Sequence, residues 1–342
     1  MIGLDVLRLQ TAFMSLGVAT LVAAFTAYPI YLLLVRLKAR QTVSEFAPGT
    51  HQAKQGTPTM GGLIPLTGIL AALLAAGAPA APLVLLLGFG AVGFADDYVV
   101  PRLVQGKRGL GWKQKLAMQL LIAAGAVGAA GLWREDTLAW AVVGLFLILF
   151  FSNAYNFSDG LDGLAGSLGL ILAGSFVVIG IHYVGSEIIV PAAAICGGLF
   201  PFLFLNAPPA KIFMGDVGSL PIGALFGWLV TLSISYRHAV PEGDAWKTDW
   251  TGIEVLALPV LILSLIMFVE LVPVPLQILS VKLRKKKLFP YTPIHHAFEL
   301  VGWKETRVVW TFALLQLLLA IVALSLAMWL GLRAGAFPEA NA

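Results

Sequence analysis

The sequence contains little charge and almost no cysteine. Only 12% of its 342 residues are Asp, Glu, Lys or Arg, whereas a soluble domain carries about 25%. This deficit, together with a hydrophobic fraction of 59%, excludes a globular enzyme held by one anchor and predicts an all-α polytopic membrane protein. The single cysteine, Cys196, lies in an apolar run, so we exclude a disulfide framework and expect a buried space-filling residue.

Ten apolar segments are long enough to cross a bilayer, which takes about 20 helical residues. The apolar run from 16 to 34 is too long for a signal-peptide core, so we expect it to form the first span. Pro273 and Pro275 should break or kink the ninth helix near the membrane surface. We find no soluble domain and expect residues 1–342 to form a single integral membrane domain. The ten segments lie at 12–35, 60–79, 81–97, 115–133, 138–155, 163–183, 188–205, 218–236, 253–275 and 307–331.

The distribution of lysine and arginine predicts which side of the membrane each loop faces. Ten spans place both termini on one side, and the five loops on the other side hold 17 of the 22 Lys and Arg residues. Because cytoplasmic loops carry the excess of positive charge, we expect these five loops in the cytoplasm and both termini on the periplasmic side. The isoelectric point near 9.2 reflects this topology rather than nucleic-acid binding.

The five cytoplasmic loops combine glycine with Asn, Asp, Lys or His, whereas the charges of the opposite loops are interpreted as solvated surface. In the fourth loop, the carboxylate of Asp216 suits a hard cation, the amide of Asn206 can read a polar edge, and Phe213 can stack on a base. An ordinary Gly/Pro-rich loop with one solvated acid is the alternative. We expect the active site on the loops at about 37–59, 96–115, 152–166, 206–219 and 276–306.

Asp96 and Asp97 stand at the end of an apolar segment. Adjacent side chains on an α-helix point about 100° apart, so one acid could face a central site while the other faces a neighbour. The helix dipole disfavours acids at a C-terminal end, and ionisable groups near the membrane are costly. We therefore favour a functional role over a simple mark of the helix end.

Asp159 and Asp162 stand three residues apart, shortly after Asn153 and Asn156. If Asp159 precedes a helix, it could be the N-cap residue, with Asp162 in the first turn. The other carboxylate and the two asparagines could instead bind a polar ligand. Gly160 would permit a close approach of the backbone to that ligand.

His295 and His296 follow a basic run at 282–287, which by itself is typical of a lipid-headgroup patch. The histidines could ligate a metal or bind phosphate, although no Cys or third His supports a zinc site. Carboxylates, lysines and histidines on one membrane face indicate an enzyme that handles phosphates with Mg²⁺. An ion-coupled transporter is the alternative, but transport sites lie near the midplane, and only Glu270 lies deep in a span.

Five motifs resemble those of the polyprenyl-phosphate N-acetylhexosamine-1-phosphate transferases. The first and last are similar to the phospho-N-acetylmuramoyl-pentapeptide-transferase branch, and the family's ten spans agree with our count. The motifs, in this order between residues 51 and 305, are Lys54-x-x-Thr-Pro-Thr-Met-Gly-Gly, Phe-x-Asp-Asp-Tyr, Asn-x-x-Asn-x-x-Asp-Gly-Leu-Asp-Gly-Leu-Ala, Phe-Met-Gly-Asp-x-Gly-Ser-Leu and Pro-Ile-His-His-x-Phe-Glu.

The resemblance implies a Mg²⁺-dependent reaction of UDP-MurNAc-pentapeptide with undecaprenyl phosphate, giving lipid I and UMP at the cytoplasmic face of the bacterial inner membrane. By motif match Asp216 would bind Mg²⁺, and Asp96 and Asp97 would serve the lipid phosphate or the metal. His295 and His296 would lie by the diphosphate or the sugar. The resemblance is compatible with a homodimer. The substrate-binding residues that it implies are Lys54, Thr59, Lys115, Asn153, Asn156, Asp159, Gly160, Leu161, Asp162, Asn206 and Phe213.

Two positions depart from the family pattern. Ala297 stands where the family often has a third histidine, and the stretch 99–101 lacks a lysine that commonly follows the acid pair. Lys107, Lys113 or Lys115 could supply that charge, and Lys115 best matches a family position. A UDP-GlcNAc donor is the alternative within the family. Direct attack by the lipid phosphate is favoured over a phospho-enzyme route.

Overall fold

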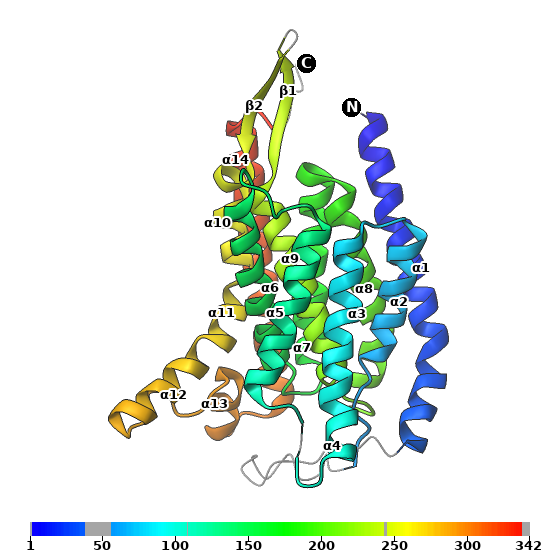
Figure 1. Cartoon of the computed structure of the whole chain (residues 1–342), viewed down its shortest axis with the longest axis vertical. Helices are drawn as coiled ribbons and strands as arrows, with labels where there is room; N and C mark the ends of the chain where they lie inside the picture. The colour runs from blue at the N-terminus through cyan, green and yellow to red at the C-terminus, as the bar shows by residue number, and fades with distance from the viewer. Residues whose placement is uncertain (1, 38–55, 108, 243–244, 337–342) are drawn as a thin grey trace.

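The structure, a computed structural model, describes residues 2–37, 56–107, 109–242 and 245–336, so the predicted site residue Lys54 lies outside the described residues. The helices pack side by side in one bundle (Figure 1). In chain order the helices, including the π-helices η2 and η3, are α1 Ile2–Arg36, α2 Leu63–Ala75, α3 Ala80–Phe94, η2 Ala95–Val99, α4 Val100–Leu103, α5 Trp112–Ala129, α6 Leu138–Ser158, α7 Leu164–Ile179, η3 Gly180–Val184, α8 Ser186–Asn206, α9 Asp216–Ser235, α10 Gly252–Leu263, α11 Leu265–Leu271, α12 Pro273–Arg284, α13 Ile294–Leu300 and α14 Glu305–Arg333.

Eight stretches of the described chain are long and apolar enough to cross a membrane, so the protein is a multi-pass membrane protein. They correspond to eight of the ten expected segments. The other two are also helical, but α2 has only 13 residues, and α5 has a less apolar composition over its 18 residues. The count of ten spans therefore stays a prediction.

The expected ninth span does not form one continuous α-helix. α10 ends at Leu263, α11 ends at Leu271, and α12 begins at Pro273 and continues to Arg284. A proline at the start of a helix is tolerated, because the N–H that it lacks has no partner within the helix there. α12 projects away from the bundle in Figure 1. The first part of the expected loop 276–306 is thus helical, which corrects the prediction.

α9 lies at the centre of the bundle and determines how closely α3 and α6 approach. Of the apolar stretch of α9, 89% is buried. A Cβ on Gly223 of α9 would collide with the backbone oxygen of Phe151 in α6, and one on Gly93 of α3 would collide with the backbone of Asp216. Small residues permit such close packing between membrane helices. The last turns of α3 and α6 and the first turn of α9 therefore meet at one end of the bundle.

A two-stranded antiparallel hairpin corrects the all-α expectation. Its strands are β1 Arg237–Glu242 and β2 Ala245–Thr251, in a segment that we interpreted as solvated surface. His238 stacks on the buried Trp250 with ring centroids 5.1 Å apart, and Tyr183 meets Trp250 edge-on at 5.7 Å. The alternation of Trp and Thr in β2 is typical of a strand, but the charges among them concealed it.

The two ends of the bundle carry different elements. The start of α1, the end of α14 and the hairpin lie at one end, and α4, α12 and α13 lie at the other (Figure 1). This second end also holds the junctions between α3 and η2 and between α6 and α7. The predicted site residues that the structure describes are therefore gathered at the end of the bundle opposite the hairpin.

Candidate active site

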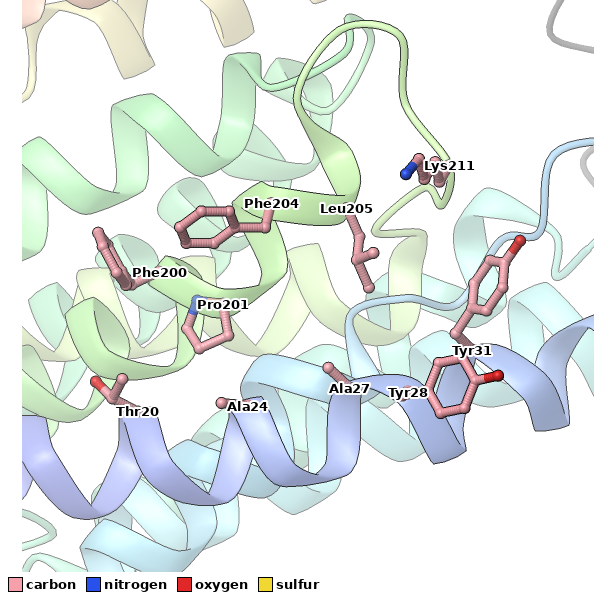
Figure 2. A pocket seen from close by; sticks show the side chains of 10 residues that line it. All are labelled: Thr20, Ala24, Ala27, Tyr28, Tyr31, Phe200, Pro201, Phe204, Leu205 and Lys211. Carbon is pink, nitrogen blue, oxygen red and sulfur yellow. The ribbon is translucent and has the colours of Figure 1, made fainter.

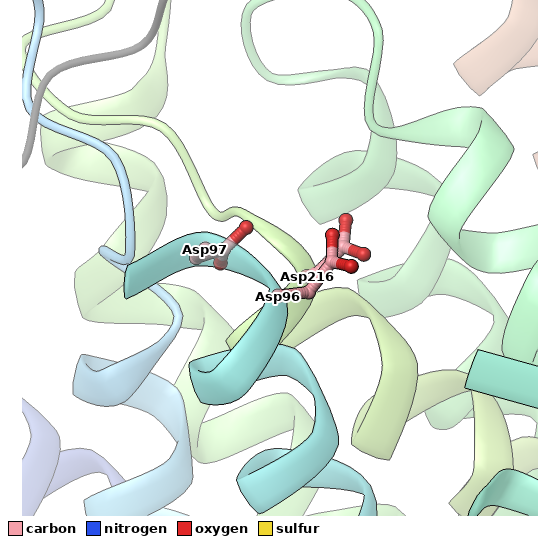
Figure 3. A group of neighbouring side chains, drawn as sticks. All are labelled: Asp96, Asp97 and Asp216. Carbon is pink, nitrogen blue, oxygen red and sulfur yellow. The ribbon is translucent and has the colours of Figure 1, made fainter. Parts of the chain in front are cut away.

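Three carboxylates form the centre of the candidate site. Asp96 and Asp97 belong to η2, and Asp216 is the first residue of α9. One oxygen of each lies within 4.8 Å of the others, and Figure 3 shows the Asp96 and Asp216 carboxylates side by side. Carboxylate oxygens are the donors that Mg²⁺ and Ca²⁺ prefer, so these partly buried residues fit a hard divalent cation.

Both adjacent acids reach one site from the π-helical turn η2. We expected α-helical geometry, in which one acid would turn towards a neighbour. A π-helix closes its hydrogen bonds over five residues, so adjacent side chains diverge less. Asp97 Oδ2 accepts a hydrogen bond from the Val217 N–H at 3.0 Å, and Asp96 Oδ1 accepts one from the Leu110 N–H at 2.7 Å. These backbone donors hold both carboxylates in the cluster.

Two further helices hold Asp216. Lys115 Nζ on α5 forms an ion pair with Asp216 and lies 3.5 Å from Asp96 Oδ2. Asn156 Nδ2 on α6 donates to Asp216 Oδ1 at 2.7 Å and to Ser219 Oγ at 2.8 Å. Of the three lysines that the sequence offered, Lys115 is the one that the structure brings to the acids. With all three carboxylates ionised, as a bound cation would favour, the cluster and the one ammonium group would together carry two negative charges, which suits a divalent cation.

Asp159 and Asp162 tie the loop after α6 to the loop before α9. Asp159 Oδ2 accepts a hydrogen bond from the Gly215 N–H at 3.2 Å, and Asp162 Oδ2 accepts one from the Ala210 N–H at 2.9 Å. Burial raises the pKa of Asp159 well above its ordinary value, and the negative charge of Asp216 raises it further. A cation bound beside Asp216 would favour the ionised form of Asp159.

The interpretation of Asp159 as an N-cap residue is wrong. α7 begins at Leu164, and its N-cap residue is Gly163, whose φ of 80° lies in the left-handed region. Glycine adopts this conformation without strain, so the turn into α7 is made there. Asp159 lies instead at the C-terminal end of α6, with its side chain directed to the site.

Asn206 and Asn153 are used within the protein framework. Asn206 Oδ1 accepts a hydrogen bond from the Gly163 N–H at 3.0 Å, and its Nδ2 donates to the Ile212 carbonyl at 2.9 Å. Asn153 Nδ2 donates to Gln119 Oε1 at 3.0 Å. Among the described residues, no hydrogen bond joins Asn153 to the acid cluster. Contacts of either asparagine with a substrate stay predictions.

The segment before α2 pairs with the segment before α9 and places Thr59 and Phe213 near the acids. The Phe213 N–H donates to the Pro58 carbonyl at 2.9 Å, and the Gly61 N–H donates to the Phe213 carbonyl at 2.7 Å. A Cβ on Gly215 would lie 2.9 Å from Thr59 Oγ1. The partly exposed ring of Phe213 thus lies three residues before Asp216 in a segment held by backbone hydrogen bonds.

The two histidines of α13 face the loop after α6. His295 Nδ1 lies 2.8 Å from Glu270 Oε2, and His296 Nδ1 lies 2.7 Å from Glu299 Oε2. A Cβ on Gly160 would collide with His295 Nε2 and would lie 3.2 Å from His296 Nε2. Both Nε2 atoms therefore point towards this glycine, between α13 and the loop after α6, which holds the predicted substrate-binding residues Gly160 and Leu161.

Known proteins carry the same sequence features. Residues 80–234 match glycosyl transferase family 4, and residues 54–64 match the phospho-N-acetylmuramoyl-pentapeptide-transferase signature 1. The chain is 36% identical over 321 residues to the phospho-N-acetylmuramoyl-pentapeptide-transferase of Bacillus subtilis (strain 168). This match covers 87% of this chain and 92% of that protein. This chain belongs to the phospho-N-acetylmuramoyl-pentapeptide-transferase family. The enzyme of that name from Moorella thermoacetica is 34% identical over 330 residues, covering 91% and 97% of the two chains.

Four side chains at or beside this candidate site were not predicted as site residues from the sequence. Glu305 Oε1 accepts a hydrogen bond from the Asp162 N–H at 2.6 Å, and Ser219 bonds to Asn156. The quoted motifs contain Ser219 and Glu299 and lie just before Glu305, so the motifs could have indicated these three residues. For Glu270, the only indication in the sequence was its position as an acid inside an apolar segment.

An apolar groove of about 690 Å³ lies between α1 and α8, outside the transferase site (Figure 2). None of the predicted site residues that the structure describes lines it. Its lining, which ends at Lys211, suits the hydrocarbon chains of a surrounding bilayer rather than a nucleotide. The residues along it are Thr20, Ala24, Ala27, Tyr28, Tyr31, Phe200, Pro201, Phe204, Leu205 and Lys211.

Proposed function

We propose that this chain transfers phospho-MurNAc-pentapeptide from UDP-MurNAc-pentapeptide to undecaprenyl phosphate, giving lipid I and UMP in the first membrane step of peptidoglycan synthesis. The observation that carries the proposal is the meeting of Asp96, Asp97 and Asp216 with Lys115 at one end of a membrane-helix bundle. The family membership supports the choice of donor. A UDP-GlcNAc donor is not favoured, because the matched relatives carry the muramoyl-pentapeptide name.

Asp96, Asp97 and Asp216 would hold Mg²⁺, with Asp216 as the principal ligand. When bound, Mg²⁺ supplies positive charge that neutralises the diphosphate and stabilises the departing UMP. Lys115 offsets charge on the same side, and Asn156 keeps the Asp216 carboxylate oriented through the 2.7 Å hydrogen bond. The site thus concentrates positive charge where two polyanions must approach each other.

The transfer itself makes little demand on a general base. A phosphate monoester has a second pKa of about 6, so undecaprenyl phosphate is largely a dianion at neutral pH. One of its oxygens attacks the β-phosphorus of the donor directly, and the bond from that phosphorus to UMP breaks. Asp96 orients the acceptor, Phe213 stacks on the uracil, and the Nε2 atoms of His295 and His296 meet the diphosphate or sugar oxygens.

The proposed membrane arrangement has ten spans, with both termini in the periplasm and the site at the cytoplasmic face of the bacterial inner membrane. The 17 to 5 distribution of Lys and Arg supports it. The start of α1 and the end of α14 lie at one end of the bundle, and α4, α12 and α13 lie at the other (Figure 1). This arrangement also supports the proposal. Both substrates would then bind at the cytoplasmic surface.

The test is UMP release by the purified full chain in detergent or nanodiscs. We expect release with UDP-MurNAc-pentapeptide, dependence on both undecaprenyl phosphate and Mg²⁺, and loss of release in excess EDTA. Release with UDP-GlcNAc in place of the muramoyl donor would contradict the proposed substrate. One equivalent of UMP released without the acceptor would instead support a phospho-enzyme route.

A further inference from the structure

Glu270 is a fully buried acid on α11, inside the apolar stretch Leu265–Arg284. An ionisable side chain within a membrane span is costly, and it is a functional candidate when its partner can be named. Its partner is His295, which is also fully buried, with Nδ1 2.8 Å from Glu270 Oε2. Glu270 Oε1 and His295 Nε2 have no hydrogen-bond partner among the described residues.

A stabilising role does not account for this pair. Taking two charges out of water costs several kcal/mol per ion, and well-packed apolar residues of similar volume often stabilise a protein as well or better. The pair also leaves two polar atoms, Glu270 Oε1 and His295 Nε2, buried and unsatisfied. Unsatisfied buried groups are destabilising, so the arrangement points to a task for the free nitrogen.

The contact determines which nitrogen faces the site. An ionised carboxylate only accepts hydrogen bonds, so His295 Nδ1 donates to Glu270, and Nε2 is the nitrogen left over. Nε2 points at Gly160, where a Cβ would collide with it. His296 is held differently, because its partner Glu299 lies three residues away on the same short helix. Glu270 comes from another helix and therefore sets the orientation of His295 from outside α13.

We propose that Glu270 is a positioning residue for the transfer reaction. It holds His295 in the form that carries a proton on both ring nitrogens, with Nδ1–H on Glu270 and with Nε2–H directed at the loop containing Gly160, where it donates to an oxygen of the donor diphosphate. A buried carboxylate on Nδ1 is a general way of presetting the orientation of a catalytic imidazole. The inference rests on the function proposed above. Because a preset donor acts most where negative charge grows in the transition state, Glu270 should influence kcat more than KM.

The decisive experiment is a double-mutant cycle on UMP release by the full chain. Glu270→Gln keeps the shape but removes the charge. It should lower kcat by roughly 10- to 100-fold, the scale seen for orienting partners of metal-bound histidines, with a smaller change in KM. In the His295→Gln background the same substitution should change kcat by less than about twofold, because its effect passes through His295. Losses that multiply in the double variant, or an unchanged kcat in Glu270→Gln, would overturn the proposal.

Glu254→Gln is the matched control. Glu254 lies in the first turn of α10, at the start of the same apolar region and away from the site. Its Oε2 accepts a hydrogen bond from the Thr251 N–H at 2.8 Å, and it is exposed. We expect its kcat and KM to equal those of the wild type. If Glu270→Gln does not fold, Glu270→Asp, which withdraws the carboxylate from Nδ1, must show the same lack of additivity with His295→Gln.

A spectroscopic readout separates this inference from the proposed function. The chain has only five histidines, so selective ¹⁵N-histidine labelling gives a tractable spectrum. One ring should show a protonated, hydrogen-bonded Nδ1, its signals should vanish in His295→Gln, and they should shift in Glu270→Gln but not in Glu254→Gln. A His295 ring without a proton on Nδ1 would overturn the positioning role even in an active enzyme. A wild type that releases no UMP would instead contradict the proposed function.

Discussion

Lys115 forms an ion pair with Asp216 although 101 positions separate the two residues in the sequence. The same ammonium group lies 3.5 Å from Asp96 Oδ2, so it stands between two of the three carboxylates of the cluster. A divalent cation bound to these acids would have to share them with the lysine. Lys115 therefore balances the charge of the acids and would oppose the binding of a metal ion to them.

The first prediction separates these two effects of Lys115. Lys115→Gln should bind Mg²⁺ more tightly, because a positive charge beside the site is removed, and should turn over substrate more slowly, because the diphosphate loses a counter-charge. We expect kcat to fall by about 10-fold or more. Mg²⁺-dependent thermal shifts and UMP release measure the two quantities. Lys113→Gln, at an exposed lysine two residues away, is the control and should change neither. Weaker Mg²⁺ binding in Lys115→Gln would contradict the prediction.

The second prediction concerns Asp216, the proposed principal metal ligand. Asp216→Asn should reduce kcat by about 100-fold or more, because one of few anionic ligands is lost, while the protein still folds and inserts. It should also abolish the rise in melting temperature that Mg²⁺ gives to the wild type. Asp136→Asn is the control, since Asp136 is an exposed acid paired with Arg134 at 3.4 Å. Near-normal turnover of Asp216→Asn at ordinary Mg²⁺ concentrations would exclude the assignment.

The third prediction assigns different kinetic roles to Phe213 and His296. Phe213→Ala should chiefly raise the KM for the nucleotide sugar, because aromatic–base stacking contributes about 1–3 kcal/mol to binding. His296→Ala should lower kcat with a smaller change in KM, because its N–H or positive charge matters most as charge grows on the departing oxygen. Steady-state kinetics in detergent measure both. The roles are wrongly assigned if the histidine variant changes only KM or the phenylalanine variant only kcat.

The fourth prediction uses two glycines with opposite surroundings. A Cβ on Gly160 would collide with the buried His295, so Gly160→Ala should displace the ring and lower kcat by up to roughly 100-fold. Gly174 of α7 has nothing within 4 Å of the corresponding position. Gly174→Ala should leave kcat unchanged and raise stability slightly, because alanine is the better helix former. Equal activities of the two variants would show that the site tolerates a side chain at position 160.

The fifth prediction tests the membrane topology. After Cys196 is replaced, Lys287→Cys should be protected from an impermeant thiol reagent in intact cells, and Glu135→Cys should be labelled. Both positions are exposed and lie at opposite ends of the bundle in the proposed arrangement. The same protection is expected across the loops at 37–58, 98–114 and 276–306. Labelling of position 287 from outside would reverse the assignment of the cytoplasmic face.

The sequence was sufficient to identify the helical segments, because an apolar run of about 20 residues has few alternatives in a bilayer. α6, α8, α9 and α14 begin and end within three residues of their expected bounds. The same reasoning failed where local chemistry, not hydropathy, decides the structure. The apolar stretch continues through α12 to Arg284, beyond the expected end at 275, and alternating Trp and Thr residues form a strand within a charged loop.

The sequence by itself also determined the candidate residues for the chemistry: the acids, the lysines, the histidines and the glycines between them all stand in motifs with short spacings. Only the tertiary structure decided how they combine. Three contacts depend on helix ends brought together from distant parts of the chain: the approach of Asp96 and Asp97 to Asp216, the ion pair of Lys115 with Asp216, and the contact of Glu270 with His295. Hydropathy determines that a segment crosses the membrane, but the close approach at Gly93 and Gly223 determines which helix ends meet there.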